Sequence, residues 1–175
     1  LSITRPDIIS EIHKSYLLAG ADLIETNTFN ANSISQADYQ MEHMVYDLNL
    51  QSAKIAKDIS DRFTKSNPNK PRFVCGAIGP TNQTASMSPD VSDPGHRNVD
   101  FDQLVDSYKE QVCGLVDGGV DILMIETVFD TLNCKAALFA IQSFFKELGQ
   151  EIPVIVSGTI TCLLYTSPSP RDRYI

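Results

Sequence analysis

Residues 118–127 read GGVDILMIET, and residues 20–26 read GADLIET, so one pattern occurs twice in the chain. Each copy has a glycine, an aspartate, a short run of aliphatic residues, and then a glutamate and a threonine. Glycine commonly ends a helix, and a short apolar run without polar alternation is typical of a strand in a parallel sheet. Both copies therefore predict the end of a helix, a buried strand, and an acidic residue at the carboxyl end of that strand.

The two halves of the repeat have different explanations. The glycine and the aspartate are equally well explained as a favourable joint between a helix and a strand. The glutamate is harder to explain in this way, because a carboxylate at the end of a buried strand is partly desolvated and needs a partner. Glu126 is therefore the best single candidate for a binding residue, with a substrate ammonium or a neighbouring Lys or Arg as its partner. Glu25 follows the same logic, but its polar neighbours are also typical of residues that cap a loop and the next helix.

Helices and strands alternate along the rest of the chain. Apolar residues at helical spacing predict amphipathic helices at about residues 6–19, 44–63, 101–117 and 131–148. Short apolar runs predict strands at residues 22–26, 72–78, 121–127 and 153–157. This alternation predicts an α/β fold with a parallel sheet. In barrels and in open sheets of this class, ligands bind at the carboxyl ends of the strands.

Particular residues fix the ends and faces of these predicted helices. Asp100 and Gln103 have the spacing of a capping box at the start of the third helix. Thr4 is a candidate cap for the first helix. The apolar residues that we expect on the buried face of the first helix are Ile9, Ile12, Tyr16 and Ala19.

The composition limits the class of protein. The chain has 175 residues, 42% of them hydrophobic, and a formal charge of −8. These values are typical of one globular domain, and the charge argues against a general binder of nucleic acids or anionic membranes. There is no apolar run of the ~18 residues that span a membrane, and no signal-peptide pattern. Four cysteines without paired spacing favour reduced thiols, so we expect a cytoplasmic protein.

Few other segments suggest chemistry. Residues 79–98 are rich in Ser, Thr, Asn, Pro and Asp, and a connection of this length is usually functional or disordered. The three histidines, His13, His43 and His96, lie on separate predicted elements and form no metal motif. The sequence also has no glycine-rich nucleotide loop and no nucleophile elbow. Spacing alone therefore predicts an enzyme-like α/β domain with a carboxylate at the strand ends.

Five segments together resemble the homocysteine-binding barrel of cobalamin-dependent methionine synthases, within the homocysteine methyltransferase family. They are GADLIETNTFN (20–30), ADYQME (37–42), GPTNQTASMSPDV (79–91), IETVFDTLN (125–133) and SGTIT (157–161). The resemblance extends from residue 3 to residue 161. Betaine-type homocysteine methyltransferases share the layout, but their loops are less similar to these segments.

The resemblance implies a (β/α)8 barrel that binds homocysteine, of which residues 1–161 hold about strands two to five with their helices. In the family, a zinc ion ionises the substrate thiol, because Zn2+ stabilises the thiolate that attacks a methyl group. The methyl donor is methylcobalamin on another domain, recharged from methyltetrahydrofolate, which implies folate-binding and cobalamin-binding domains in the same polypeptide. Glu126 matches the strand-four carboxylate that binds the substrate amino group. Thr26 and Thr28 match the polar rim of strand two, which implies that they line the substrate pocket.

The chain also departs from the family pattern. The family's zinc cysteines follow strands six and eight, beyond residue 161, so we assign no metal ligand and no catalytic residue here. We expect the isolated chain to hold neither zinc nor cobalamin and to be inactive. The glycine-rich first strand and an initiator Met are missing, so we expect a piece of a longer protein. Residues 162–172 read CLLYTSPSPRD, which resembles a translated transposon-end sequencing adapter. We therefore predict that residues 162–175 are a non-native tail.

The sequence leaves several functions open. The first is a fragment of a methionine synthase. The second is a non-catalytic half-barrel interaction module, which would need to dimerise to cover its sheet edges. The third is another (β/α)8 enzyme, either a homocysteine S-methyltransferase with a different methyl donor or a zinc-independent lyase that uses Glu126. Zinc content and homocysteine binding of the full-length protein would separate these functions.

Overall fold

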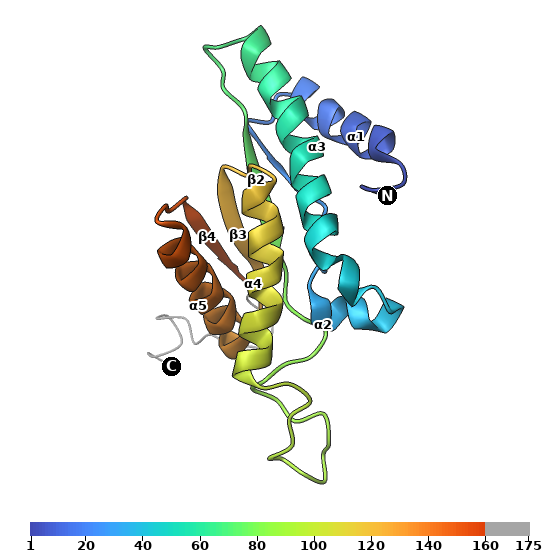
Figure 1. Ribbon diagram of the computed structural model, residues 1–175, viewed down its shortest axis with the longest axis vertical. Coiled ribbons are helices and arrows are strands. Elements are labelled where there is room, and N and C mark those ends of the chain that lie inside the picture. The colour runs from blue at the N-terminus through green and yellow to red at the C-terminus, as the bar shows by residue number, and fades with distance from the viewer. Residues whose placement is uncertain (160–175) are drawn as a thin grey trace, which may run out of the picture.

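A computed structural model describes residues 1–159, and the predicted tail at residues 162–175 lies outside this range. The described part contains a parallel sheet of four strands that follow one another in chain order (Figure 1). The strands are β1 (Leu23–Glu25), β2 (Phe73–Ile78), β3 (Ile122–Val128) and β4 (Val154–Gly158). The long helices are α1 (Pro6–Leu18), α3 (Val45–Ser66), α4 (Phe101–Asp117) and α5 (Thr131–Leu148). The predicted α/β fold is confirmed.

The topology is that of one side of a barrel. The register pairs Leu23 with Phe73, Cys75 with Ile122, and Leu123 with Val154, all in parallel. A helix connects each strand to the next, and the strand order never reverses. An open doubly wound sheet would reverse its order at a switch point, whereas a barrel adds each strand beside the previous one. Residues 1–159 therefore form an incomplete (β/α)8 barrel.

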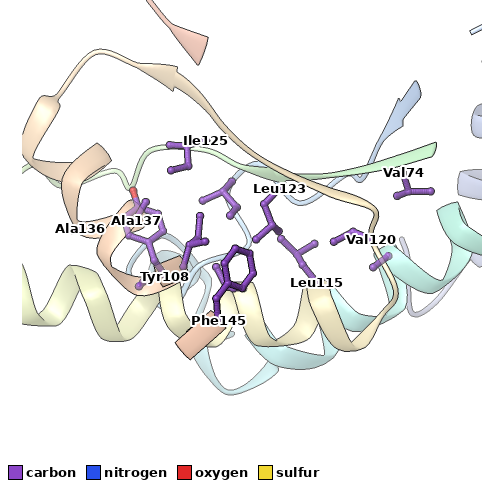
Figure 2. Close-up of a cluster of buried hydrophobic side chains, with 14 of the residues drawn as sticks. Val74, Tyr108, Leu115, Val120, Leu123, Ile125, Ala136, Ala137 and Phe145 are labelled. Carbon is purple, nitrogen blue, oxygen red and sulfur yellow. The ribbon is translucent and has the colours of Figure 1, made fainter. Parts of the chain in front are cut away.

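The two faces of the sheet have different surroundings. Ile24, Val74 and Leu123 point toward the helices and are buried. In Figure 2 the strand residues Val74, Leu123 and Ile125 are drawn with Leu115 of α4 and Phe145 of α5 in this core. Residues at alternate positions form the opposite face, which we call the inner face. Its larger apolar members are partly exposed, namely Leu23 (36%), Phe73 (43%) and Ile155 (40%).

Capping explains where α4 and α5 begin and end. The Asp100 carboxylate accepts a hydrogen bond from the Gln103 backbone N–H at 2.8 Å, and the Gln103 side chain accepts one from the Asp100 N–H at 3.0 Å. This reciprocal capping box confirms the sequence prediction. α4 ends at Gly118, where a Cβ atom would lie 2.4 Å from the Ala53 Cβ, so only glycine lets α4 pack this closely on α3. Gly149 ends α5 in a left-handed conformation (φ 71°).

The predicted buried face of α1 is wrong. Ile12 is 48% exposed and Tyr16 is 64% exposed, whereas Ile9, His13 and Leu17 are buried. The error arises because His13 is polar by type yet occupies the middle of the buried stripe. Its Nε2 has no hydrogen-bond partner among residues 1–159, and burial lowers the pKa of the imidazole, which favours the neutral form. The predicted cap is also wrong, because the cap position is held by Arg5 and not by Thr4.

The amino ends of the strands, which we call the amino edge, explain the glycine–aspartate half of the repeat. Gly20 and Gly119 have positive φ angles of 108° and 89°, which glycine adopts easily. The Asp121 carboxylate accepts from Lys57 Nζ at 2.7 Å and from the Val74 backbone N–H at 2.8 Å. Asp22 has an equivalent position, 2.9 Å from Arg72 Nη1. These residues form structural joints between helices and strands.

Candidate functional site

The carboxyl ends of β1, β2 and β3, with the loops that follow them, form the carboxyl edge. Glu25 and Glu126 both lie at this edge, as the repeat predicted. Residues 79–98 also leave it, and no helix or strand interrupts them before α4. In the connection between β1 and α3, the structure adds α2 (Ser33–Gln36) and two single 3-10 turns that sequence patterns did not indicate.

Thr26 and Thr28 connect β1 to β2 through buried hydroxyl groups. The Thr28 hydroxyl donates to the Ala77 carbonyl oxygen at 2.7 Å, and the Thr26 hydroxyl lies 2.7 Å from that of Thr28. The Ala77 backbone N–H in turn donates to Thr26 at 3.0 Å. The exposed fractions are 4% for Thr26 and 0% for Thr28. This geometry uses both hydroxyl protons within the protein and holds the edge together, so contact with a substrate stays a prediction for both residues.

A β-bulge surrounds Glu126. Ile125 pairs with Val156 and Val128 pairs with Gly158, so two residues of β3 face one residue of β4. The second of the two, Thr127, has a φ of 55°, which is unusual for a β-branched residue. Strain of this kind costs on the order of 1–3 kcal/mol and is often found at functional sites. Because a bulge changes the direction of nearby side chains, it sets the direction of Glu126.

Glu126 is a half-buried carboxylate without a cation. Burial raises its pKa above the ordinary value, and the nearby charge of Glu25 raises it further. Among residues 1–159, no Lys, Arg or His forms an ion pair with Glu126 or Glu25, and neither side chain forms a hydrogen bond to another residue. The alternative of a neighbouring Lys or Arg partner therefore finds no support in the described part of the chain.

Cys75 lies between the two glutamates on the inner face. It pairs in register with Glu25 of β1 and with Ile122 of β3, and Glu126 follows four residues after Ile122, in the β-bulge. Burial, followed by the charges of Glu25 and Glu126, raises the pKa of the Cys75 thiol to about 12. The thiol is therefore neutral near pH 7 and is not a nucleophile there.

The first turn of α5 holds the long loop next to this site. Asp130 caps the helix by accepting from the Leu132 and Asn133 N–H groups, and it also accepts from the Ser86 hydroxyl. The buried Asn133 side chain donates to Thr81 Oγ1 at 2.7 Å. Asp130, Asn133 and Glu126 line the same small cavity. The loop and the strand that carries Glu126 are thus attached to one helix end.

A comparison with protein families identifies the chain. The model of the homocysteine S-methyltransferase family matches residues 1–169. The chain belongs to the homocysteine S-methyltransferase family. Three structures of the homocysteine methyltransferase MmuM from Escherichia coli share its fold, at 20–22% sequence identity.

The match to MmuM covers only part of that protein. The metallated form has a TM-score of 0.67 over 82% of this chain and 50% of that chain. The apo form has a TM-score of 0.62 over 89% of this chain and 50% of that chain. The chain therefore spans about half the length of MmuM.

The described residues of this chain do not fit a zinc site by themselves. Residues 1–159 bring no three His, Cys, Asp or Glu side chains close enough to hold a metal ion. Cys75 is on a strand, whereas Cys113 and Cys134 are on separate helices. A zinc site needs at least three protein ligands around one point. The same residues also contain no helix that is long and apolar enough to cross a membrane.

Proposed function

We propose that this chain is part of a methionine synthase, and that Glu126 binds the ammonium group of homocysteine. The observation that carries the proposal is the half-buried Glu126 carboxylate at the carboxyl end of β3, which has no cationic partner among residues 1–159. A carboxylate in such a place is stabilised by a ligand that brings a positive charge. The amino group of an amino acid substrate supplies that charge.

The structure suggests how the substrate is oriented. In a (β/α)8 enzyme the reacting groups gather at the carboxyl ends of the strands, where Glu126 lies. Because the bulge at Glu126 and Thr127 fixes the direction of the carboxylate, the bound ammonium is fixed as well. The thiol end of homocysteine is then free to point toward residues outside 1–159. Zinc bound there would lower the pKa of that thiol.

The identity of the methyl donor is the finer part of the proposal. The family match supports a homocysteine methyltransferase, and the loop sequences at residues 79–91 and 125–133 favour the methionine synthase type. We propose methylcobalamin as the donor, recharged from methyltetrahydrofolate on further domains of the same polypeptide. We also propose that residues 1–159 alone do not methylate homocysteine, because they lack a zinc ligand set.

Substitution of Glu126 tests the binding role. In the full-length protein, Glu126→Gln removes a charge-assisted hydrogen bond, and we expect homocysteine binding to weaken by about 1.5–3 kcal/mol, which is roughly 10- to 150-fold. Calorimetric titration with L-homocysteine measures this change. Glu110→Gln is a matched control, since Glu110 is also half-buried with a raised pKa but lies on α4. An unchanged dissociation constant in Glu126→Gln would refute the assigned role.

A donor assay separates the two kinds of methyltransferase. The full-length protein is supplied with L-homocysteine and either methylcobalamin or a sulfonium methyl donor, and methionine is quantified. We expect methionine only with methylcobalamin. Methionine formed with the sulfonium donor alone would support the alternative of a homocysteine S-methyltransferase with a different donor. The half-barrel interaction module predicts no methionine with either donor and a dimer in solution.

A further inference from the structure

Thr127 has an unusual backbone conformation directly beside Glu126. Its φ of 55° is one of two positive values among the non-glycine residues of 1–159. A β-branched residue keeps such a conformation only where the surrounding structure fixes the chain on both sides. On the amino-terminal side, Ile125 is fixed by its pairing with Ile78 and Val156 in the sheet. The contacts on the carboxyl-terminal side therefore decide whether the Glu126 carboxylate keeps its direction.

The carboxyl-terminal side is held by the last pairing of β3 and by the first turn of α5. Val128 pairs with Gly158, and the Val128 carbonyl oxygen accepts a hydrogen bond from the Thr159 N–H at 2.9 Å. Asp130 then caps α5. Because the chain between the bulge and the helix is this short, a shift of the helix start is transmitted to Thr127.

Asn133, in that first turn, binds the loop after β2 with both ends of its carboxamide. Its Nδ2 donates to Thr81 Oγ1 at 2.7 Å and to the Gln83 carbonyl oxygen at 3.1 Å. Its Oδ1 accepts from the Ala85 N–H at 3.3 Å. The side chain is only 2% exposed, so these hydrogen bonds satisfy a polar group that is costly to bury without partners. Asn133 therefore fixes the start of α5 against residues 81–85.

The segment that Asn133 binds is itself held from two other directions. Asn82 Nδ2 donates to Asp38 Oδ2 at 2.7 Å, in the connection that follows β1. Arg97 Nε donates to the Ala85 carbonyl oxygen at 2.8 Å, from the far end of the loop. The segment is thus a fixed support, and Asn133 attaches α5 to it.

We propose that Asn133 is a positioning residue for Glu126. By fixing the start of α5, it holds the strained bulge at Thr127 and so keeps the carboxylate directed at the substrate ammonium group. Asn133 and Glu126 line the same small cavity, but no hydrogen bond joins them among the described residues. The influence of Asn133 therefore passes through the backbone. This inference rests on the role proposed above for Glu126.

A double-mutant cycle on the full-length protein tests this role. Calorimetric titration with L-homocysteine is carried out on Asn133→Ala, on Glu126→Gln and on the double variant. We expect Asn133→Ala to weaken binding about tenfold alone, but less than about twofold in the Glu126→Gln background, because the directed carboxylate is already lost there. Thr81→Val removes one acceptor of Asn133 and keeps the side-chain shape. It should show the same pattern with a smaller loss, and it replaces Asn133→Ala if that variant fails to fold.

Asn49→Ala is the matched control. Asn49 is also a fully buried asparagine on a helix, and its Nδ2 donates to the Ala31 and Val45 carbonyl oxygens at 2.7 Å each. It lies on α3 and has no contact with the start of α5 among its hydrogen bonds. Any effect of Asn49→Ala on homocysteine affinity should therefore be equal with and without Glu126→Gln.

Hydrogen exchange of the backbone amides separates this inference from the proposed function, because it needs no ligand. We expect residues 126–130 to exchange about tenfold faster in Asn133→Ala than in Asn49→Ala or the unchanged protein. Unchanged exchange there, or equal losses of affinity in both Glu126 backgrounds, overturns the positioning role even if Glu126→Gln behaves as predicted. If Glu126→Gln leaves homocysteine binding unchanged, the proposed function fails and the role of Asn133 in binding fails with it, whereas faster exchange would still show that Asn133 holds the bulge.

Discussion

At the amino edge of the sheet, Asp22 and Asp121 are paired with cations, whereas at the carboxyl edge Glu25 and Glu126 have no cation among residues 1–159. All four residues come from the same sequence repeat. The amino edge is held by side-chain charges, with Lys57 and the Val74 N–H around Asp121. The carboxyl edge is held by other means, so its carboxylates stay available to a ligand.

Backbone contact and hydroxyl groups take the place of ion pairs at the carboxyl edge. The Gly79 N–H donates to the Phe29 carbonyl oxygen at 3.0 Å, and Thr26 and Thr28 connect β1 to β2. The contrast shows how one repeated motif can serve both stability and binding. The paired aspartates at the amino edge stabilise the fold, whereas the unpaired glutamates at the carboxyl edge can bind a ligand.

The largest loss of stability should come from a methyl group added at Gly79, where the backbone after β2 lies against Phe29. In Gly79→Ala the new Cβ would lie 2.4 Å from the Phe29 carbonyl oxygen and 2.8 Å from its ring. We expect a loss of about 3 kcal/mol in the free energy of unfolding, because backbone atoms must move. Urea denaturation followed by circular dichroism measures it. Gly158→Ala is the matched control, since nothing lies within 4 Å of a Cβ there. Equal losses in both variants would contradict the close approach.

Asp121→Ala should destabilise the amino edge. This change leaves the Val74 N–H without its acceptor and leaves Lys57 with only its longer ion pair to Asp61, so we expect a loss of about 1–3 kcal/mol in unfolding free energy. Asp121→Asn keeps an oxygen for the Val74 N–H and should lose less. The same urea measurement compares the two variants. Equal losses in Asp121→Asn and Asp121→Ala would show that charge pairing, and not the backbone contact, dominates.

The equivalent substitution in the first copy of the repeat, Asp22→Ala, should destabilise the fold less. The Asp22 side chain is 70% exposed, so its pair with Arg72 is screened by solvent. We expect Asp22→Ala to cost less than about 1 kcal/mol and the cost to fall at high salt. Urea denaturation at low and high salt provides the measurement. A salt-independent loss would mean that Asp22 acts through something other than its charge.

The smallest effect on stability should come from Glu126→Gln, and it should be a gain and not a loss. Because folding raises the pKa of Glu126, the unfolded chain ionises first as pH rises, and stability falls between the ordinary carboxyl pKa and the raised one. Glu126→Gln removes this loss, so the ligand-free chain should become more stable near neutral pH. Below the ordinary pKa of about 4.3 the gain should vanish. Thermal unfolding at both pH values tests this, and a gain of equal size at both would rule out ionisation as its cause.

Sequence patterns were sufficient for the elements whose ends are determined by local chemistry. The capping box at Asp100 and the glycine after α5 correctly predicted the ends of their helices. The position of Glu126 at a strand end was also predictable, because a buried strand is recognised by its apolar run. The buried face of α1 was not, since the burial of His13 depends on packing against the rest of the fold and not on the residue type.

Contacts between distant segments could not be predicted. Thr26 accepts a hydrogen bond from the Ala77 N–H and Thr28 donates one to the Ala77 carbonyl oxygen, about fifty residues away, and only the strand register brings these residues together. The bulge after Ile125 could not be predicted from the sequence either, because it depends on how β4 pairs with β3. Register also places Glu25 level with Cys75 and Ile122, which the sequence alone does not show.

The burial of Cys75 makes this residue useful as a chemical reporter. The thiolate is the species that attacks an alkylating reagent, and a fully buried thiol with a pKa of about 12 provides almost no thiolate near pH 7. Cys75 should therefore resist iodoacetamide while β1, β2 and β3 stay together, and react once they separate. Labelling at this position, followed by mass spectrometry of the peptide, would time the opening of the strands that hold both glutamates.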